Sequence, residues 1–377
     1  MADLSYLFVQ RDAGSSVYTA VAKYLQTRED KSWKKVPKDS TRFNLMLGDR
    51  NKLPYSKLGQ IRGLTQVVNY YRGSDVICRK ASLVRTLKDY CEEQKLRMFE
   101  WMPTSFVIYP PCDQEVVVIG EEKLVRQRRS RSDERDQLKK CAERAPHVIW
   151  IAKSSNGAKG DGIQISSDVG SLVQMVDSQK KAYVIQQYID SPLLLSGGRK
   201  FDIRCWVLID ATYTIYLYRE GVLRTASEEY EPDRLDHLTA HLTNHALQQE
   251  LSENFGKYEV GNEMFYDEFD SFLQDKYGVG LDTAILPQIR SIVKTCLGIV
   301  QSKLNTTGLD YWSFQLLGFD FMVDSDLKVW LLEVNGAPAC AQKLLSGLVQ
   351  SLVETAIDPV FVPYGQVQYG PNLFDQI

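Results

Sequence analysis

Apolar and polar positions along the chain predict strands and helices in mixed order. Short apolar runs typical of strands lie at 5–9, 43–47, 106–109, 147–153 and 183–189, and two more strands are expected within 200–220. Helical spacing predicts helices over 15–25, 80–94, 171–176, 284–304 and 339–357, with Ser16 as the N-cap of the first and Pro287 in the first turn of the fourth. This succession indicates an α/β fold.

Polar side chains interrupt two apolar runs near the C-terminal end. The runs, 314–324 and 329–338, flank a short polar turn, which predicts a β-hairpin. The interruptions are Asp320, Glu333 and Asn335. Glu333 and Asn335 are two positions apart, so they project from the same face of their strand.

The register of this hairpin decides whether the three polar groups meet. If the turn spans four residues, Asp324 pairs with Val329, and Asp320 then lies opposite Glu333 with side chains about 5 Å apart. Two carboxylates and the amide oxygen of Asn335 among apolar neighbours suit a hard cation, so the pattern predicts a Mg²⁺ site that also contacts phosphates. The alternative is that these residues end their strands and face solvent.

Composition and charge narrow the class of protein. The 377 residues carry a formal net charge of −3 and are 44% hydrophobic, as in ordinary globular chains of two or three domains. No overall positive charge favours nucleic acid. The 7 cysteines are scattered without a Cys-x-x-Cys pair, and neither a signal-peptide pattern nor an apolar run of membrane-spanning length is evident, so we expect a soluble intracellular protein.

Two further segments predict an anion site. Residues 154–162 form a glycine-rich loop after an apolar strand that ends in Lys153, and Ser155 adds a hydroxyl donor. The loop lacks the Walker and G-x-G-x-x-G patterns, and a flexible hairpin is the alternative. Residues 200–204 alternate, so Lys200, Asp202 and Arg204 share one strand face.

That charged face is either solvated or part of the anion site. Arg224 ends a second basic strand nearby, and arginines beside a metal site suit phosphoryl transfer. His237, His241 and His245 have helical spacing that would allow a metal site, but residues 242–244 fit a turn leading to a polar site better. The charged segment 121–144 is either a nucleic-acid or nuclear-import patch or a solvated helix or loop.

Eight blocks of this sequence resemble one known family. Trp150–Ser155, Lys200–Arg204, Tyr218–Arg224, His241–His245 and Leu332–Pro338 are similar, in order and spacing, to the tubulin–tyrosine ligase-like family of ATP-grasp enzymes. Phe43–Gly48, Val68–Gly73 and Cys78–Leu83 resemble the compact founding branch of that family. The resemblance covers nearly the whole chain and is weakest over 112–146.

The resemblance implies an ATP-grasp-type fold in three parts. Residues 1–70 would form a small N-terminal α/β domain for tubulin recognition, 71–190 a central subdomain with a glycine-rich lid, and 191–377 a C-terminal subdomain with the metal-binding hairpin. The two larger α/β parts would enclose ATP.

The implied activity is addition of free tyrosine to the C-terminal glutamate of detyrosinated α-tubulin, with ATP and Mg²⁺, through an acyl phosphate and with release of ADP. The expected partner is the α/β-tubulin heterodimer with its acidic tail, and neither nucleic acid nor a membrane is expected. We further expect a monomer in the cytoplasm, associated with the cytoskeleton. A tubulin glutamate or glycine ligase, or a non-catalytic tubulin-binding module, is the alternative.

Site roles follow from the resemblance position by position. Phosphates would be held by Lys80, Lys153 and Ser155, adenine by Gln186, Gln187, Tyr188 and Ile189, and the nucleoside by Lys200 and Asp202; Thr243 and Asn244 would complete the ATP site. Arg204 and Arg224 would stabilise the transferring phosphoryl group, and Asp320, Glu333 and Asn335 would hold Mg²⁺. Arg50, Lys52, Arg72 and Arg79 would attract the acidic tail. Gln187 stands where the family pattern has lysine.

Overall fold

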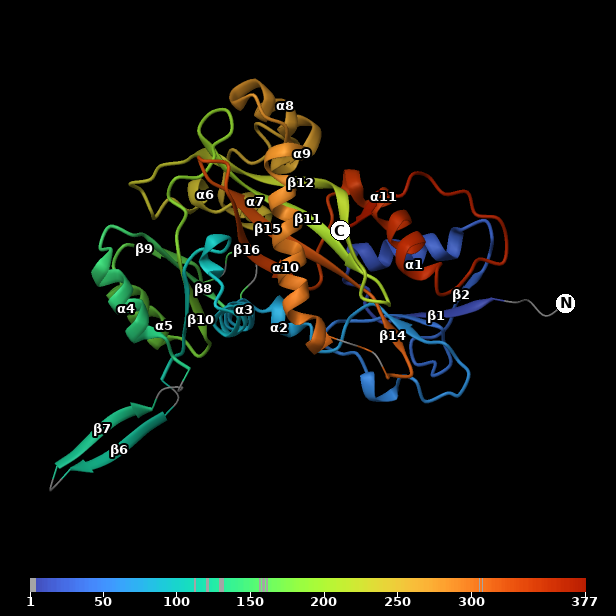
Figure 1. Cartoon of the computed structure of the whole chain (residues 1–377), viewed down its shortest axis with the longest axis horizontal. Coiled ribbons are helices and arrows are strands. Elements are labelled where there is room, and N and C mark those ends of the chain that lie inside the picture. The colour runs from blue at the N-terminus through green and yellow to red at the C-terminus, as the bar shows by residue number, and fades with distance from the viewer. Residues whose placement is uncertain are drawn as a thin grey trace.

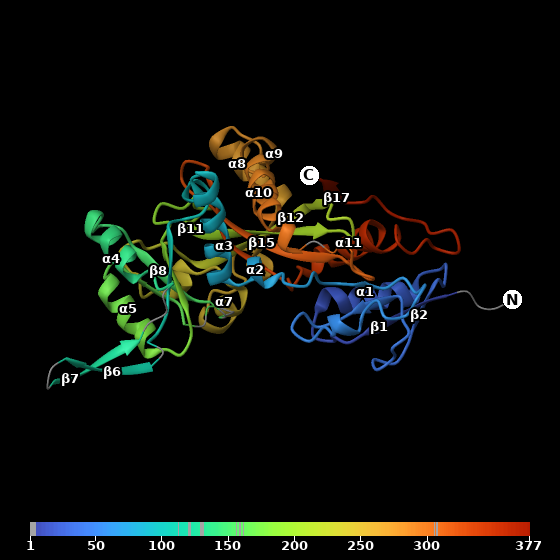
Figure 2. The same cartoon turned by 60° about the horizontal axis from the view of Figure 1, so that its bottom comes forward.

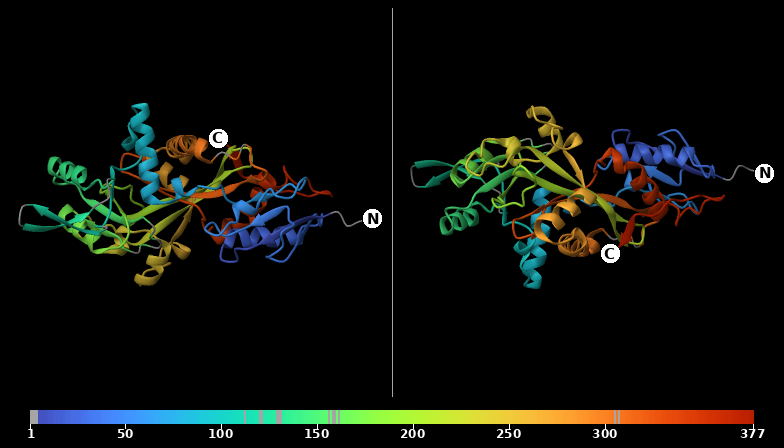
Figure 3. Two further views of the ribbon diagram at one scale, coloured as in Figure 1. Left: turned by 90° about the horizontal axis from the view of Figure 1, so that it is seen from below. Right: turned by 90° about the horizontal axis from the view of Figure 1, so that it is seen from above.

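The computed structural model describes residues 5–111, 113–119, 122–128, 132–155, 157, 160, 162–304, 306 and 308–377. The chain forms three sheets with helices packed against them, and a two-stranded ribbon extends from one end (Figure 1). The prediction of a mixed α/β fold is confirmed. The N-terminal part and the ribbon lie at opposite ends of the molecule in both views of Figure 3. None of the helices among these residues is both long and apolar enough to span a bilayer.

The N-terminal sheet is parallel and has the order β14-β4-β3-β1-β2. Its strands are β1 (Tyr6–Gln10), β2 (Trp33–Lys35), β3 (Leu45–Leu47), β4 (Val67–Val68) and β14 (Trp312–Ser313). Helix α1 (Ser16–Thr27) begins after Ser15, whose hydroxyl accepts a hydrogen bond from the amide of Tyr18, so the prediction of Ser16 as the N-cap is wrong by one residue. The edge strand β14 comes from far along the chain, so this sheet is not built from the first 70 residues alone.

The central sheet is antiparallel, with the order β5-β10-β8-β9. Its elements are β5 (Ser105–Ile108), β8 (Trp150–Ser154), β9 (Gln164–Ser166) and β10 (Tyr183–Gln187), with helices α2 (Asp75–Cys78), α3 (Lys80–Gln94), α4 (Arg135–Arg144) and α5 (Val169–Ser178). The ribbon pairs β6 (Asp113–Ile119) with β7 (Glu122–Arg128). The expectation of a helix or loop over 121–144 is therefore wrong for β7 and right for α4, while residues 121 and 129–131 lie outside the described part.

The largest sheet runs β13-β12-β11-β15-β16, with β17 paired to β12. Its strands are β11 (Arg199–Ile209), β12 (Ile215–Glu229), β13 (Glu263–Phe265), β15 (Gln315–Val323), β16 (Val329–Asn335) and β17 (Phe374–Gln376). The helices are α6 (Leu238–His241), α7 (His245–Leu251), α8 (Tyr266–Tyr277), α9 (Leu281–Ala284), α10 (Leu286–Leu304) and α11 (Gln342–Leu352), which continues as one π-helical turn to Ile357. Strands β11 and β15 cross the middle of the molecule in Figure 2.

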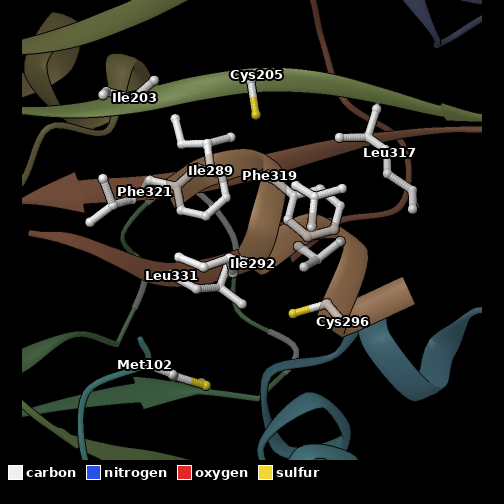
Figure 4. Close-up of a cluster of buried hydrophobic side chains, with 14 of the residues drawn as sticks. Met102, Ile203, Cys205, Ile289, Ile292, Cys296, Leu317, Phe319, Phe321 and Leu331 are labelled. Atoms are coloured by element: carbon white, nitrogen blue, oxygen red, sulfur yellow. The ribbon is translucent and has the colours of Figure 1, made fainter. Parts of the chain in front are cut away.

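Strand β11 has one apolar and one charged face, and this alternation separates the core from the site. Ile203 and Cys205 point into a buried cluster with Phe319, Phe321 and α10 (Figure 4). The opposite face carries Lys200, Asp202 and Arg204, which are 1%, 1% and 9% exposed. These three charges are therefore buried, and the interpretation of this strand as a solvated face is wrong.

The hairpin forms, but with a different register from the one predicted. Val323, and not Asp324, pairs with Val329, and the same register continues to Phe321 opposite Leu331. A β-bulge then shifts the pairing by one residue, so that Asp320 does lie opposite Glu333. The juxtaposition of the two carboxylates is thus confirmed, although the predicted turn pairing is wrong.

The N-terminal sheet is clamped to the C-terminal segment by a buried ion pair. Arg28, which follows α1, donates to both carboxylate oxygens of Asp358 at 2.9 and 2.7 Å and also bonds Asp30. Tyr369 donates to the same Asp358 carboxylate at 2.5 Å. A shared core of α1 and α11 residues lies beside this cluster, and the two helices are adjacent in Figure 1.

Replacing Arg28 with methionine is expected to lower the free energy of unfolding by about 3–5 kcal/mol, because it leaves two buried carboxylates without their cation. Denaturant unfolding followed by fluorescence measures this change. As a control, Arg234→Met removes an exposed arginine that pairs with Glu231 on the surface, and a change of at most about 1 kcal/mol is expected. Equal changes in the free energy of unfolding for the two substitutions would contradict a stabilising role of the buried ion pair of Arg28.

Candidate active site

A cavity of about 310 Å³ lies between the central and the largest sheet. Its polar wall collects side chains predicted for the ATP and metal sites: Lys80, Lys153, Gln186, Gln187, Tyr188, Lys200, Asp202, Arg204, Arg224, Thr243, Asn244, Asp320, Glu333 and Asn335. Ile189 lines it as well. Residues from both halves of the chain are therefore brought to one place, as the sequence predicts.

Three oxygen-bearing side chains converge at one end of this cavity. Asp320 is 2% exposed, and Asn335 Nδ2 lies 3.1 Å from Asp320 Oδ2 and 3.2 Å from Glu333 Oε1. Burial would raise the pKa of Glu333, but the charges of Lys80, Lys153 and Arg224 outweigh it and hold that pKa well below its usual range. Glu333 is therefore an anion at neutral pH.

The donor set at this end fits Mg²⁺. It consists of two carboxylates and one amide, which is what Mg²⁺ uses when phosphates and water complete its shell. Asn335 now directs its amide nitrogen at both carboxylates, and a half-turn of the amide would present its oxygen instead. Among the described residues, no group of three or more His, Cys, Asp or Glu side chains is placed to hold a metal, so a thiolate or imidazole site is not formed there.

Two arginines are anchored on buried carboxylates beside the oxygen cluster. Arg204 bonds both oxygens of Asp320, and Arg224 Nη2 donates to Asp320 Oδ2 at 2.8 Å. Arg224 also bonds Asp202, which accepts a hydrogen bond from Thr243 Oγ1 at 2.5 Å. Burial raises the pKa of Asp202, and the charge of Arg224 opposes this effect. These pairs fix both guanidinium groups in the cavity wall.

The lysines are held by different kinds of partner. Lys80, at the start of α3, forms an ion pair with Glu333 at 2.7 Å. Lys153 donates to Gln186 Oε1 at 2.9 Å, and Gln186 in turn donates to Ser105 Oγ at 2.9 Å. Gln186 thus orients Lys153 in addition to lining the cavity, a role that its place in the sequence does not indicate. Burial, assisted by the charge of Lys80, lowers the pKa of Lys153 to about 8.

The remaining wall is apolar and follows the end of β10. The amides of Gln187 and Tyr188 donate to the carbonyls of Thr104 and Ile149 at 2.7 and 2.8 Å, which fixes this backbone. Apolar side chains from other segments complete the wall: Pro103, Ile151, Ile163, Leu242, Met322 and Leu332. Leu332 lies at the β-bulge of the hairpin, between Leu331 and Glu333.

A second cavity of about 250 Å³ adjoins the oxygen cluster. Lys80, Glu333 and Asn335 line both cavities, and Ser155 lines only the second, where its hydroxyl accepts a bond from the Ala81 amide at 3.4 Å. Ser155 therefore lies outside the first cavity and lines the second one together with Lys80.

The four arginine and lysine residues predicted for tail binding do not gather in one place. Arg50 and Arg79 line the second cavity, and both pair with Asp75, at 3.0 and 2.7 Å. Lys52 is exposed and pairs with Asp49, and Arg72 is exposed as well; within the described parts of the chain, neither lines the second cavity.

The three residues between α6 and α7 form a short non-helical connection, in agreement with the expected break in the helix, and residues on either side of it join the cavity wall. His241, Leu242, His245 and Ala246 line the first cavity beside Thr243 and Asn244. Both ring nitrogens of His241 form hydrogen bonds, to Tyr188 and to the carbonyl of Arg234. His241 is therefore not available as a metal ligand in this arrangement, and the regular histidine spacing in the sequence was the signal that pointed to this segment.

Comparison with known proteins identifies similar sequences over most of the chain. A sequence model of the Tubulin-tyrosine ligase family matches residues 60–368. "Probable alpha-tubulin polyglutamylase Ttll1" of Tetrahymena thermophila is 27% identical over 297 residues, which are 73% of this chain and 66% of that protein. Tubulin glycylase 3C of the same organism is 29% identical over 56% of this chain, and Tubulin glycylase 3A of Drosophila melanogaster is 32% identical over 50%. The matches span only 20% of each glycylase.

Proposed function

The chain belongs to the Tubulin-tyrosine ligase family, and from this premise we propose that it is an ATP-dependent ligase that joins an amino acid to the tail of tubulin. One observation carries the proposal. A single cavity combines an oxygen cluster suited to Mg²⁺, lysines and arginines suited to phosphates, and an apolar wall beside a fixed strand end. These are the groups that an enzyme needs to activate a carboxylate with ATP.

In this proposal the polar end holds the triphosphate and the apolar wall holds adenine. Asp320, Glu333 and Asn335 would bind Mg²⁺, which would neutralise phosphate charge. A carboxylate oxygen of the tail attacks the γ-phosphorus and ADP leaves, which gives an acyl phosphate. The amine of the incoming amino acid then attacks the carbonyl carbon, phosphate leaves, and the amine releases one proton as the peptide bond forms. Arg204 and Arg224 are placed to stabilise the charge on the transferred group.

The second cavity is where we place the carboxylate end of the substrate tail. It adjoins the oxygen cluster through Lys80, Glu333 and Asn335, and Arg50 and Arg79 give it positive charge. Arg50 also packs against the backbone just after the hairpin, because a Cβ added at Gly336 would lie 2.1 Å from Arg50 Nη1. An acidic chain entering here would bring its carboxylate next to the phosphate-binding groups.

Three amino acids remain as candidates for the attached residue. The names of the relatives favour glycine or glutamate. Tyrosine, added to a C-terminal glutamate, is the narrower candidate and rests on the motifs at 43–48, 68–73 and 78–83. Incubation with ATP, Mg²⁺, detyrosinated tubulin and labelled tyrosine, glutamate or glycine, followed by mass spectrometry of the tail, distinguishes them. The absence of any ATP-dependent product with all three would support a non-catalytic tubulin-binding module instead.

Binding of an acidic tail peptide is expected to weaken as salt rises from 50 to 500 mM, because the contacts proposed for Arg50 and Arg79 are electrostatic and screened by ions. Fluorescence anisotropy with a labelled peptide measures this dependence. The same titration with Lys52→Gln is expected to change little, since Lys52 is exposed and lies outside both cavities. Affinity that is independent of salt would contradict the placement of the tail.

Binding of ATP at pH 8 is expected to take up protons. Burial, with help from the charge of Lys153, lowers the pKa of Lys200 to about 7, so its amine is mostly neutral at pH 8. Bound phosphates favour the charged form and raise this pKa, so affinity should be highest below pH 7 and fall as the pH rises through the pKa of the bound state. Calorimetry at pH 8 in two buffers of different ionisation enthalpy measures the uptake, and an identical heat in both would contradict it.

A further inference from the structure

A chain of buried hydrogen bonds runs from the cavity wall into the protein behind it. Lys200 Nζ donates to Tyr188 Oη at 2.7 Å, Tyr188 Oη lies 2.7 Å from His241 Nδ1, and His241 Nε2 lies 2.9 Å from the carbonyl oxygen of Arg234. The side chains come from β11, the end of β10 and α6, and the residues are 1%, 5% and 2% exposed. Water therefore has little access to the first two bonds, whereas the bond to the carbonyl of Arg234 is only partly buried.

The groups at the two ends of this series of hydrogen bonds decide which atom donates and which accepts in each bond. The carbonyl of Arg234 only accepts, so His241 must carry its proton on Nε2. A charged Lys200 amine only donates, so Tyr188 Oη accepts from it and gives its own proton to His241 Nδ1. His241 is then neutral with a bare Nδ1. Burial and the nearby charge of Lys200 lower the pKa of His241, in agreement with this state.

Lys200, at the cavity end of this series of hydrogen bonds, has no carboxylate partner among the described residues. Among the described residues, Lys200 forms no ion pair; its amine lies 4.0 Å from the ring centroid of Tyr188 and 5.3 Å from that of Tyr230. A phenol and two aromatic faces stabilise a cation without neutralising it. A bound anion in the cavity would favour the charged form of Lys200 and pair with it, while Tyr188 and His241 fix the direction of its side chain.

We propose that His241 is a positioning residue for the nucleotide: through Tyr188, it holds the Lys200 amine at the wall of the cavity where ATP binds. This inference rests on the proposed function, because it assigns ATP to that cavity. His241 lines the cavity, yet both of its ring nitrogens are hydrogen-bonded to protein groups. Its effect on the nucleotide is therefore indirect.

The test compares substitutions that keep or remove the acceptor for Tyr188. His241→Phe keeps a ring and removes the acceptor, whereas His241→Asn places an amide oxygen near the position of Nδ1. We expect His241→Phe to raise the Kd for ATP about tenfold, with KM for ATP rising and kcat nearly unchanged, since the lost contact serves binding. His241→Asn is expected to recover most of the affinity. Calorimetry with Mg²⁺ and ATP, together with steady-state kinetics, provides both readouts.

A matched control and a double-substitution cycle separate this role from a general effect on packing. His237, four positions earlier, has a ring Nδ1 without a hydrogen bond, and His237→Phe is expected to leave the affinity for ATP unchanged. Tyr188→Phe combined with His241→Phe is expected to cost no more than the larger single effect, because both break one chain. Tyr188→Phe also carries the test alone if His241→Phe does not fold.

Three results would overturn the inference: wild-type affinity for ATP in His241→Phe, failure of His241→Asn to recover affinity, or additive effects in the cycle. If the unsubstituted protein does not bind ATP, the proposed function fails. If the unsubstituted protein binds ATP and His241→Phe binds it with the same Kd, only the role of His241 fails.

Discussion

Glu333→Gln is expected to reduce the turnover of ligation at least about 10²–10³-fold while leaving the affinity for the tail peptide within about threefold of wild type. The substitution keeps the shape of the side chain and removes its charge. It therefore takes away one of the two carboxylates of the oxygen cluster and leaves Lys80, 2.7 Å away, without its anion. Turnover is measured as ATP-dependent incorporation of the labelled amino acid, and affinity by anisotropy.

Glu100→Gln serves as the control, since Glu100 is exposed and pairs with Arg97 on the surface. Turnover of that variant should equal wild type. Near-normal turnover in Glu333→Gln would contradict a role of the oxygen cluster in the reaction. An equal loss of tail affinity would assign Glu333 to substrate binding instead of to Mg²⁺.

The predicted placement of Asp320 opposite Glu333 is confirmed, but for a reason that the sequence does not contain. The expected pairing of Asp324 with Val329 is wrong by one residue, and such a shift would normally turn Asp320 away from Glu333. The bulge at Leu332 shifts the strand back. Alternation along a strand predicts which residues share a face, but a bulge depends on tertiary packing and leaves no signature in the apolar pattern.

Periodic segments were predicted well because their stability is local in sequence. The helix over 80–94 and the long helix ending at Leu304 form where the apolar spacing places them. The edge strand β14 was not predictable, since Trp312–Ser313 pairs with β4 across more than half of the chain. The prediction for 121–144 is wrong over β7 for another reason: only Leu124 and Val125 of that strand are apolar, so its sequence shows no strand pattern.

The candidate site was predicted as a set of residues but not as a set of bonds. Residue type and spacing identified the arginines and the carboxylates, whereas only the fold shows that Arg224 lies between Asp202 and Asp320. The link from Lys153 through Gln186 and the one from Lys200 through Tyr188 to His241 likewise join segments far apart in sequence. Side chains that act behind the cavity wall have no pattern of their own in the sequence.

The bridging position of Arg224 leads to the second large expected effect. Arg224→Lys should lower turnover about 10²–10³-fold, because a lysine has one point of charge and cannot bond Asp202 and Asp320 with a planar fork while facing the transferred group. The buried charge is conserved, so the protein is expected to remain folded. Incorporation of the labelled amino acid and release of ADP measure the loss, and thermal unfolding checks the fold.

Arg219→Lys on the same strand is the matched control. Arg219 is half exposed and pairs with Asp375 at 2.7 Å, away from the cavity, so its substitution should leave turnover unchanged. If Arg224→Lys and Arg219→Lys have the same turnover, the fork between the two carboxylates has no role in the reaction. If Arg224→Lys loses turnover and also unfolds, its role is structural; if it loses turnover with its thermal unfolding unchanged, the buried carboxylates hold Arg224 in place for the reaction.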